Sequence, residues 1–428
     1  MRLVRRSAFG CVLVCGVAVG AAAQAPRTMT WSDIRDRFRA TNPTLQAGQI
    51  GVDESRAAEM TAYLRPNPQW SLTLDQVGNT EEGNAFSAAN LVTGFSYLHE
   101  RQQKRELRRD SAQGATAIAM SAQADLERNL MFALRSSFVQ VLQAKAFRTL
   151  AQDNLTSYDQ VLSLSRDRLQ AGDIAQIDLD RLQLQRVTYE SDVQTAEVNL
   201  RTAKIQLLRL LNDQATQVDQ FDVSGPFDFA TPAQPLDELR RIALETRPDL
   251  RAAMQGIDKA KTDHQLAFAN GSVDPTINVD AGFPSISQAF QSYQPALRQY
   301  VGVGVSVPLR IFDRNQGEKL RTELDITRNE RLADAARLQV FGDVDTAYAT
   351  VMSTVTLLQP YKDRYLDQAT RVRDTVTFSY QRGNVSLVDF LQAQQEYRAV
   401  QVSYLNLIAA FLSAVNQLNL AVGQEVIP

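Results

Sequence analysis

The segment Leu169-Gln-Ala-Gly-Asp-Ile-Ala-Gln-Ile-Asp-Leu179 returns later in the chain as Tyr380-Gln-Arg-Gly-Asn-Val-Ser-Leu-Val-Asp-Phe390. A second pair lies upstream, where Thr41-Asn-Pro-Thr-Leu45 matches Thr246-Arg-Pro-Asp-Leu250 at nearly the same separation. Segments that repeat in the same order at a nearly constant separation indicate an internal duplication. We therefore expect two copies of one structural unit.

Each copy carries two long stretches of helical character on either side of its glycine. They cover 101–170 and 175–212 in the first copy, and 318–382 and 385–421 in the second, where Pro360 is the only proline. A run of about 70 helical residues spans on the order of 100 Å, far beyond an ordinary globular helix. Their faces are rich in Gln, Ala, Ser, Asp and Arg, which suits a wall with water on both sides.

Two shorter alternating segments precede the long helices in each copy, near 68–78, 90–98, 275–283 and 300–309. In the third segment, Ile277, Val279 and Ala281 interleave with polar residues. This alternation predicts strands with one apolar and one polar face. An amphipathic hairpin on a soluble core remains an alternative, because barrel strands give weak signals one by one. The long helices favour the membrane interpretation.

The N-terminus has the layout of a secretory signal peptide, with Arg2, Arg5 and Arg6 before an apolar run and Ala21-Ala22-Ala23 at its end. We expect a signal peptide over 1–23, a first repeat over 24–213, a linker or equatorial segment over 214–235 and a second repeat over 236–428. Cys11 lies in the middle of the apolar run, which does not fit a lipid anchor.

Composition excludes several classes of protein. Both cysteines fall in the signal peptide, and His99 and His264 stand far apart without a ligand pattern, so we expect no metal or cofactor. The net charge of -3 becomes more negative without the signal arginines, which disfavours nucleic acid. No G-x-S-x-G, H-E-x-x-H or P-loop is present, so an enzyme is not expected. No further apolar run of about 18 residues remains, so any membrane span should use strands.

Taken together, these features resemble the TolC-type outer-membrane efflux family over essentially the whole mature chain. The likeness rests on the two duplicated pairs and on Val305-Ser-Val-Pro-Leu-Arg-Ile-Phe-Asp-Arg-Asn-Gln-Gly317. The passage from Pro308 to Gly317 is most similar to the heavy-metal branch, the outer components of cation and copper efflux systems. Members of that branch are often lipidated, and this sequence departs from them there.

The resemblance implies a mixed α/β membrane protein with a defined architecture. Four strands from each of three chains would form a β-barrel of about 12 strands in the outer membrane. A long α-helical barrel with a mixed belt would continue into the periplasm. The chain would act as a passive exit duct of a tripartite efflux or type I secretion system, with a periplasmic adaptor and an inner-membrane pump as partners. A structural coiled-coil spacer or adhesin stalk is the alternative.

The resemblance and the repeat also indicate site residues at the two turns. We expect Asp389, and through the repeat Asp178, to line an aperture, although Ser386 to Asp389 also fits a capping box that would merely fix the turn. An adaptor-contact tip is expected from the turn glycines and the apolar residues after them: Gly172, Ile174, Ile177, Gly383, Val385 and Leu387. Packing between the paired helices is the alternative for these apolar side chains.

Overall fold

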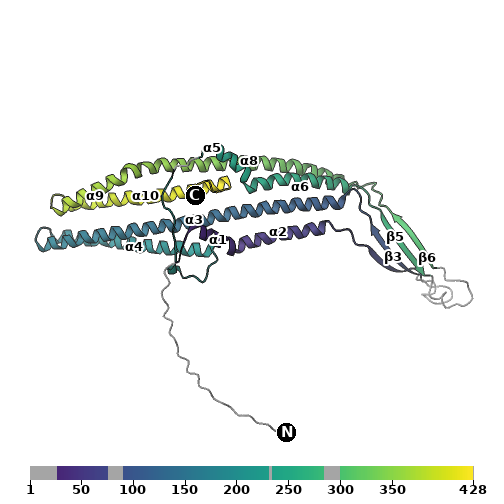
Figure 1. Ribbon diagram of the computed structural model, residues 1–428, viewed down its shortest axis with the longest axis horizontal. Helices are drawn as coiled ribbons and strands as arrows, with labels where there is room; N and C mark the ends of the chain where they lie inside the picture. Colours follow the sequence, from purple (N-terminus) through teal and green to yellow (C-terminus); the bar gives the residue numbers. More distant parts are fainter. Residues whose placement is uncertain (1–26, 76–89, 231–233, 284–298, 428) are drawn as a thin grey trace, which may run out of the picture.

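The computed structural model describes residues 27–75, 90–230, 234–283 and 299–427. The expected signal peptide, with both cysteines, lies outside the described residues. A sheet lies at one end of the elongated molecule and two helical turns lie at the other, joined by long helices (Figure 1). The first half contains β1 (Arg27–Met29), α1 (Trp31–Thr41), α2 (Pro43–Ala62), β2 (Gln69–Asp75), β3 (Asn90–Leu98), α3 (Lys104–Gln170), α4 (Gln176–Leu210), η1 (Val218–Gln220) and β4 (Phe221–Val223). The second half contains α5 (Leu236–Thr246), α6 (Pro248–Asn270), β5 (Thr276–Phe283), β6 (Tyr300–Ser306), α8 (Gln316–Pro360), η2 (Tyr361–Tyr365), α9 (Leu366–Gln381) and α10 (Leu387–Val422).

Two of the four long helical rods are each formed by one continuous length of the chain. They differ in the regularity of their hydrogen bonding. Helix α3 has 67 residues and is helical throughout. Its counterpart is divided, because Pro360 ends α8 and the π-helical turn η2 separates it from α9. Proline has no N–H to donate and its ring crowds the preceding turn, so a local change of hydrogen-bonding pattern at this position is expected.

The other two long rods are stacks of two helices each. Thr41 at the end of α1 donates its hydroxyl to the carbonyl of Leu211 at 3.0 Å, which caps the C-terminal end of α4 beside the start of α2. Thr246 makes the equivalent contact with the carbonyl of Val422, the last residue of α10, at 2.6 Å. These bonds satisfy carbonyls that a helix end leaves without partners. The duplicated Thr-x-Pro motif therefore joins α2 to α4 and α6 to α10.

The second stack is held by a buried charge network. The side chain of Arg247 is only 4% exposed and donates to Asp249 at 2.6 Å and to Asp343 at 2.7 Å. It also donates to the carbonyl of Ala421 at 3.2 Å. Burial alone would raise the pKa of Asp249, but the hydrogen bonds from Arg247 and the charges of Arg128 and Arg247 outweigh it and hold that pKa below its usual value.

The sheet joins the two copies. Its order is β2-β3-β5-β6 and each neighbouring pair is antiparallel, so the central β3–β5 pairing links the first repeat to the second. At the base of the sheet, the buried ammonium group of Lys104 contacts Asp274 at 2.6 Å. This ion pair fixes the start of α3 beside the start of β5.

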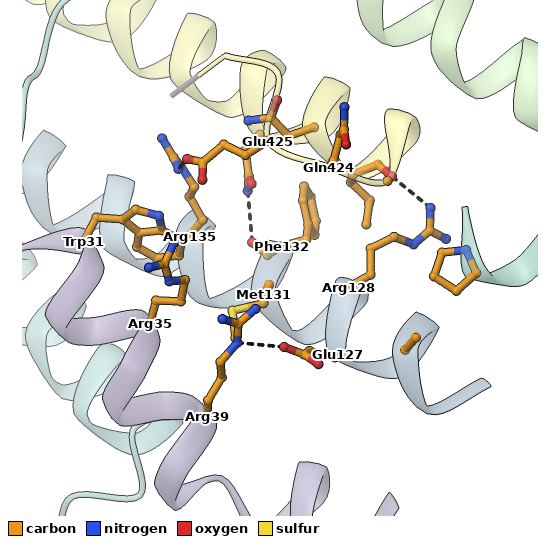
Figure 2. A pocket seen from close by; sticks show the side chains of 16 residues that line it. Trp31, Arg35, Arg39, Glu127, Arg128, Met131, Phe132, Arg135, Gln424 and Glu425 are labelled. Atoms are coloured by element: carbon orange, nitrogen blue, oxygen red, sulfur yellow. Dashed lines mark hydrogen bonds and ion pairs between the residues drawn. The ribbon is translucent and has the colours of Figure 1, made fainter. Parts of the chain in front are cut away.

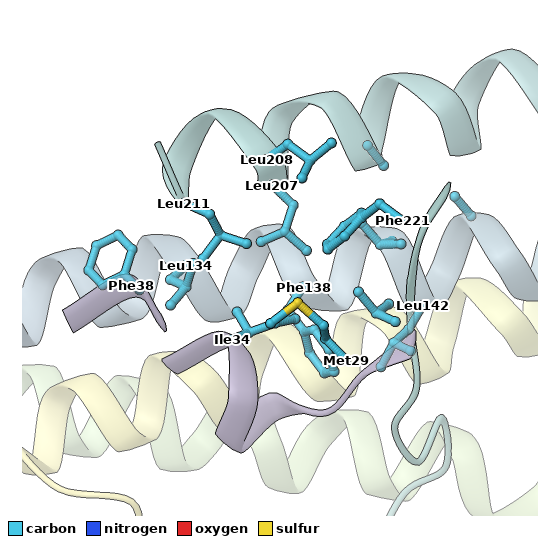
Figure 3. Packing of buried hydrophobic residues seen from close by; sticks show 14 of the residues in the cluster. Met29, Ile34, Phe38, Leu134, Phe138, Leu142, Leu207, Leu208, Leu211 and Phe221 are labelled. Carbon is cyan, nitrogen blue, oxygen red and sulfur yellow. The ribbon is translucent and has the colours of Figure 1, made fainter. Parts of the chain in front are cut away.

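The middle of the molecule forms a belt. Part of the segment expected to be a linker is a strand here, because β4 pairs with β1 in parallel. Phe221 of β4 and Met29 of β1 pack with Ile34, Phe138 and Leu207 in a core between α1, α3 and α4 (Figure 3). A second core packs α5 against α8 and α10.

One helix is more apolar than the others. Among the described residues, α10 is long and apolar enough by length and composition to cross a membrane, although half of its most apolar window is buried in the chain itself. Phe411, Val415 and Leu418 on this helix pack into the core with α5 and α8. Its composition therefore matches that of a helix placed between other helices.

The Arg247 network yields a stability prediction. Replacing Arg247 by alanine leaves the half-buried carboxylates of Asp249 and Asp343 without their shared partner, and we expect the free energy of unfolding to fall by about 1.5–3 kcal/mol. The matched control is Arg241→Ala, because Arg241 is exposed and pairs with Glu238 and Glu245 on its own helix. Denaturant unfolding in detergent measures both, and equal losses would contradict the assignment.

The same variant should also alter the pH dependence. Since the pKa of Asp249 is lowered in the folded protein, its stabilisation is complete above the ordinary aspartate range and disappears as pH falls through the folded value. The unmodified protein should lose stability on acidification more steeply than the Arg247→Ala variant.

Candidate functional site at the helical tip

Both helical turns reverse through glycine in the left-handed conformation. Gly172 has a φ of 85° and Gly383 a φ of 79°, a conformation that glycine adopts without a Cβ penalty. Each turn is closed by the same backbone hydrogen bond, from the N–H of Asp173 to the carbonyl of Arg168 and from the N–H of Asn384 to the carbonyl of Ser379, both at 2.9 Å. The two tips are therefore equivalent in backbone geometry.

A small core binds the two tips together. Tyr158 stacks on Tyr189 with ring centroids 4.6 Å apart, and Tyr380 stacks on Phe390 at 4.7 Å. These rings share one buried cluster with Leu179, Leu182 and Leu387. Burial raises the pKa of Tyr158, whose hydroxyl donates to the carbonyl of Leu182 at 3.1 Å.

Polar contacts also cross between the hairpins. Arg168 on α3 donates to the carbonyl of Tyr380 on α9 at 2.8 Å, and Arg398 on α10 pairs with Asp192 on α4 at 2.8 Å. Together with the tip core, these contacts hold α3, α4, α9 and α10 as one unit at this end of the molecule.

The apolar residues expected at the adaptor contact take different positions. Ile177 is 57% exposed, whereas Ile174 and Val385 are half-buried. Leu387 is only 8% exposed because it points into the tip core. The next residue, Val388, is 63% exposed. Within six residues after the two tip glycines, the exposed large apolar side chains are therefore Ile177 and Val388, and the sequence analysis missed Val388.

The two aspartates also differ in their surroundings. Asp389 is exposed. Its N–H donates to the hydroxyl oxygen of Ser386 at 3.2 Å, and the hydroxyl of Ser386 donates to the carboxylate of Asp389 at 2.7 Å. The amide of Thr30 completes a capping box with Asp33 at the start of α1, but the amide of Ser386 makes no such bond with Asp389. The carboxylate of Asp389 therefore remains accessible to solvent.

Asp178 has no equivalent cap. It lies in the first turn of α4, where Ala175 at the N-cap offers no side-chain hydrogen bond. Its carboxylate is half-buried and has no hydrogen-bond or ion-pair partner among the described residues. The two aspartates that the repeat makes equivalent are thus both at the tip and both retain an unpaired carboxylate oxygen.

The arrangement of sheet, stacked rods and paired tips is that of an outer-membrane channel protomer. It superposes on the outer-membrane channel OprN with a TM-score of 0.75 at 15% identity, covering 92% of this chain and 89% of that one. CusC gives a TM-score of 0.73 at 19% identity, with 92% of both chains covered. These likenesses give the fold.

Sequence comparison matches the second half of the chain to a family. Residues 239–424 match the family described as "Outer membrane efflux protein". The chain is 22% identical to the cobalt-zinc-cadmium resistance protein CzcC of Cupriavidus metallidurans, over 90% of this chain and 87% of that protein. It is 26% identical to the pyoverdine export outer membrane protein OpmQ of Pseudomonas aeruginosa, over 80% and 72% of the two chains. The second half of the chain thus matches the outer membrane efflux protein family, and the protein is an efflux channel of the outer membrane that extends into the periplasm.

Proposed function

We propose that three copies of this chain close a single duct, with the sheet as their contribution to a shared barrel in the outer membrane. The observation that carries this proposal is the register of the sheet. It aligns Trp70, Phe95, Val279 and Val303 in one row across all four strands. Directly opposed residues of antiparallel strands lie on the same face, so this row and its neighbours form one continuous apolar face.

The opposite face is mostly polar or bare. Its rows include Gln69, Ser96, Asn278 and Gly304, and then Ser71, Gly94, Asp280 and Gly302. The carboxylate of Asp280 lies against Gly94, where an added Cβ would stand 2.4 Å from it. An apolar outer face and a polar inner face are the pattern of a membrane barrel that holds water.

The edges of the sheet set the number of chains. Among the described residues, β2 and β6 each have a strand partner on one side only. An unpaired backbone group in lipid costs several kcal/mol, so neighbouring copies must pair these edges. About 8 strands leave an interior filled by side chains, whereas about 12 can enclose a water channel. A trimer is therefore the smallest assembly that forms a duct.

At the other end, the tips would meet the partners. We propose that Ile177 and Val388 contact a periplasmic adaptor, since they are exposed and apolar at the far end of a hydrophilic rod. Asp178 and Asp389 would ring the aperture where the tips of three copies converge. The duct itself would be passive, with energy supplied by an inner-membrane pump.

The domain division and the substrate follow from the same proposal. The two repeats, 24–213 and 236–428, would be products of one duplication, each contributing two strands and one tip. CzcC is named for resistance to cobalt, zinc and cadmium, and OpmQ for the export of pyoverdine. The passage from Pro308 to Gly317 favours metal cations as cargo, selected by the pump rather than by the duct.

The first prediction concerns assembly. The detergent-extracted protein should have the mass of a trimer and form channels in planar bilayers, because only shared edges close the barrel. Mass photometry and single-channel recording measure both properties. A stable monomer or dimer with full conductance would disprove the shared barrel, and trimers without conductance would favour a spacer.

The second concerns the adaptor contact. The variants Ile177→Asp and Val388→Asp should abolish efflux in cells, because a charge at an apolar contact is costly to desolvate. Trimer mass and conductance should stay unchanged, since neither side chain is part of the tip core. The control Val388→Ile keeps the apolar surface and should keep efflux. Normal efflux in both charged variants would refute the contact.

The third concerns the aperture. Replacing Asp178 and Asp389 together by asparagine should weaken cation selectivity and block by multivalent cations, as measured by reversal potential and block in bilayers. The control Ser386→Ala removes the cap, should cost about 0.5–2 kcal/mol of stability, and should leave selectivity alone. If selectivity in the double variant equals that of the unmodified channel, the aspartates do not line the aperture.

A further inference from the structure

A cleft of about 390 Å³ lies in the belt, away from both the sheet and the tips. Helix α1 forms one wall, α3 the floor, and the end of α10 with the segment after it the other wall (Figure 2). The proposed duct does not use this cleft. Its volume falls within the range of small-molecule sites, about 300–1,000 Å³.

The lining combines an apolar floor with a cationic rim. Met131, Phe132 and Leu420 are only half-buried and face the opening. Four arginines surround them: Arg35 and Arg39 from α1, and Arg128 and Arg135 from α3. Glu127 and Glu425 are the only acidic residues in the lining. The cleft therefore offers more positive than negative charge next to an apolar surface.

One of the four arginines is committed to the fold. Arg128 pairs with Asp125 at 2.6 Å and donates to the carbonyl of Leu420 at 2.8 Å, while Asp249 lies 3.6 Å away. Its guanidinium is satisfied by these partners, so it contributes to the belt rather than to a ligand site.

The other three arginines have weaker or exchangeable partners. Arg35 pairs only with the exposed side chain of Asp36, its neighbour in sequence, at 3.3 Å. Arg39 pairs with Glu127 at 2.7 Å in a half-exposed contact. Arg135 pairs with Glu425, which is itself exposed. Exposed ion pairs contribute little to stability, so an external carboxylate can replace them at low cost.

The contact between Arg135 and Glu425 indicates that the cleft can bind a carboxylate. Arg135 lies over the ring of Trp31, with its guanidinium carbon 5.0 Å from the ring centroid. This stacking fixes the plane of the guanidinium, which then presents its N–H groups to a carboxylate. The indole N–H of Trp31 is buried and has no hydrogen-bond partner within the described chain.

Glu425 reaches this position from a short anchored segment. Asn419 accepts hydrogen bonds from the N–H groups of Val426 and Ile427 at 2.9 and 3.2 Å, which holds the backbone in place. Only the side chain of Glu425 has to rotate to free the guanidinium of Arg135. The chain thus places its own carboxylate where a ligand carboxylate would bind.

We propose that this cleft binds an anionic ligand that carries a carboxylate beside an apolar or aromatic group, and that Glu425 competes with it. Arg35, Arg39 and Arg135 bind the carboxylate, and the floor of Met131, Phe132 and Leu420 receives the apolar group. The ligand can be a free small molecule or an acidic segment of a periplasmic protein, because both present the same chemistry.

Trp31 provides a direct readout. The chain has two tryptophans, so Trp70→Phe leaves Trp31 as the only one. Full-length Trp70→Phe protein in detergent is titrated with N-acetyl-glutamyl-phenylalanine amide, and separately with an acidic hexapeptide that contains the same pair. We expect a saturable change in fluorescence that weakens with added salt. A dipeptide that binds as tightly as the hexapeptide indicates a small molecule, whereas a markedly tighter hexapeptide indicates a protein segment.

Variants distinguish a binding site from a merely structural cleft. Arg39→Gln and Arg135→Gln should each weaken binding about tenfold or more, since each removes a charged hydrogen bond. Glu425→Gln should tighten it several-fold by removing the competitor. The matched control Arg148→Gln removes an exposed arginine elsewhere on α3 and should bind normally. Absence of saturable binding by both probes, or unchanged affinity in the Arg39 and Arg135 variants, would overturn the site. Weaker binding by Glu425→Gln would overturn its role as competitor.

Discussion

The unpaired backbone of the two outer strands is the constraint on which the rest of the structure depends. A sheet with one apolar and one polar face, and with both edges open, satisfies its hydrogen bonds in lipid only as part of a closed ring. The long helices start from this sheet, because the buried Lys104–Asp274 pair holds the start of α3 against the start of β5. Farther from the sheet, the helices are held together by their own hydrophobic cores.

The two halves of the chain have similar layouts but differ in their chemistry. At the stack of α2 on α4, the residue before proline is Asn42, a neutral cap whose side chain accepts from the N–H of Leu45. At the stack of α6 on α10, it is Arg247, the centre of an ion network. The uninterrupted α3 likewise corresponds to the divided α8 and α9. The second half thus has the more strongly connected helix stack at the belt, whereas its long helical rod is less regular than α3.

Much of the fold could be predicted from sequence because its signals are local. The absence of helix breakers indicates the long rods, and alternation indicates the strands, whose faces follow from a period of two. The outward position of Val388 instead of Leu387 could not be predicted, because the turn geometry at Gly383 sets the phase of the following helix. Strand β4 was not predicted, because a segment of three residues is too short to show an alternating pattern of apolar and polar residues. The arginine cleft is formed by segments that lie far apart in the sequence. Its only sequence signal is the helical spacing of Trp31, Arg35 and Arg39, which puts these three residues on one face of α1.

The stacked rods have a mechanical consequence. In α3 every turn is linked to the next by the covalent chain, so this rod resists tension along the axis of the molecule. Where α2 meets α4 and α6 meets α10, the ends are joined by hydrogen bonds, ion pairs and apolar packing without a covalent link, and such contacts resist compression well and extension poorly. Under an axial pull from the tips, the stacks would part at the belt first, and the continuous rods would carry the load.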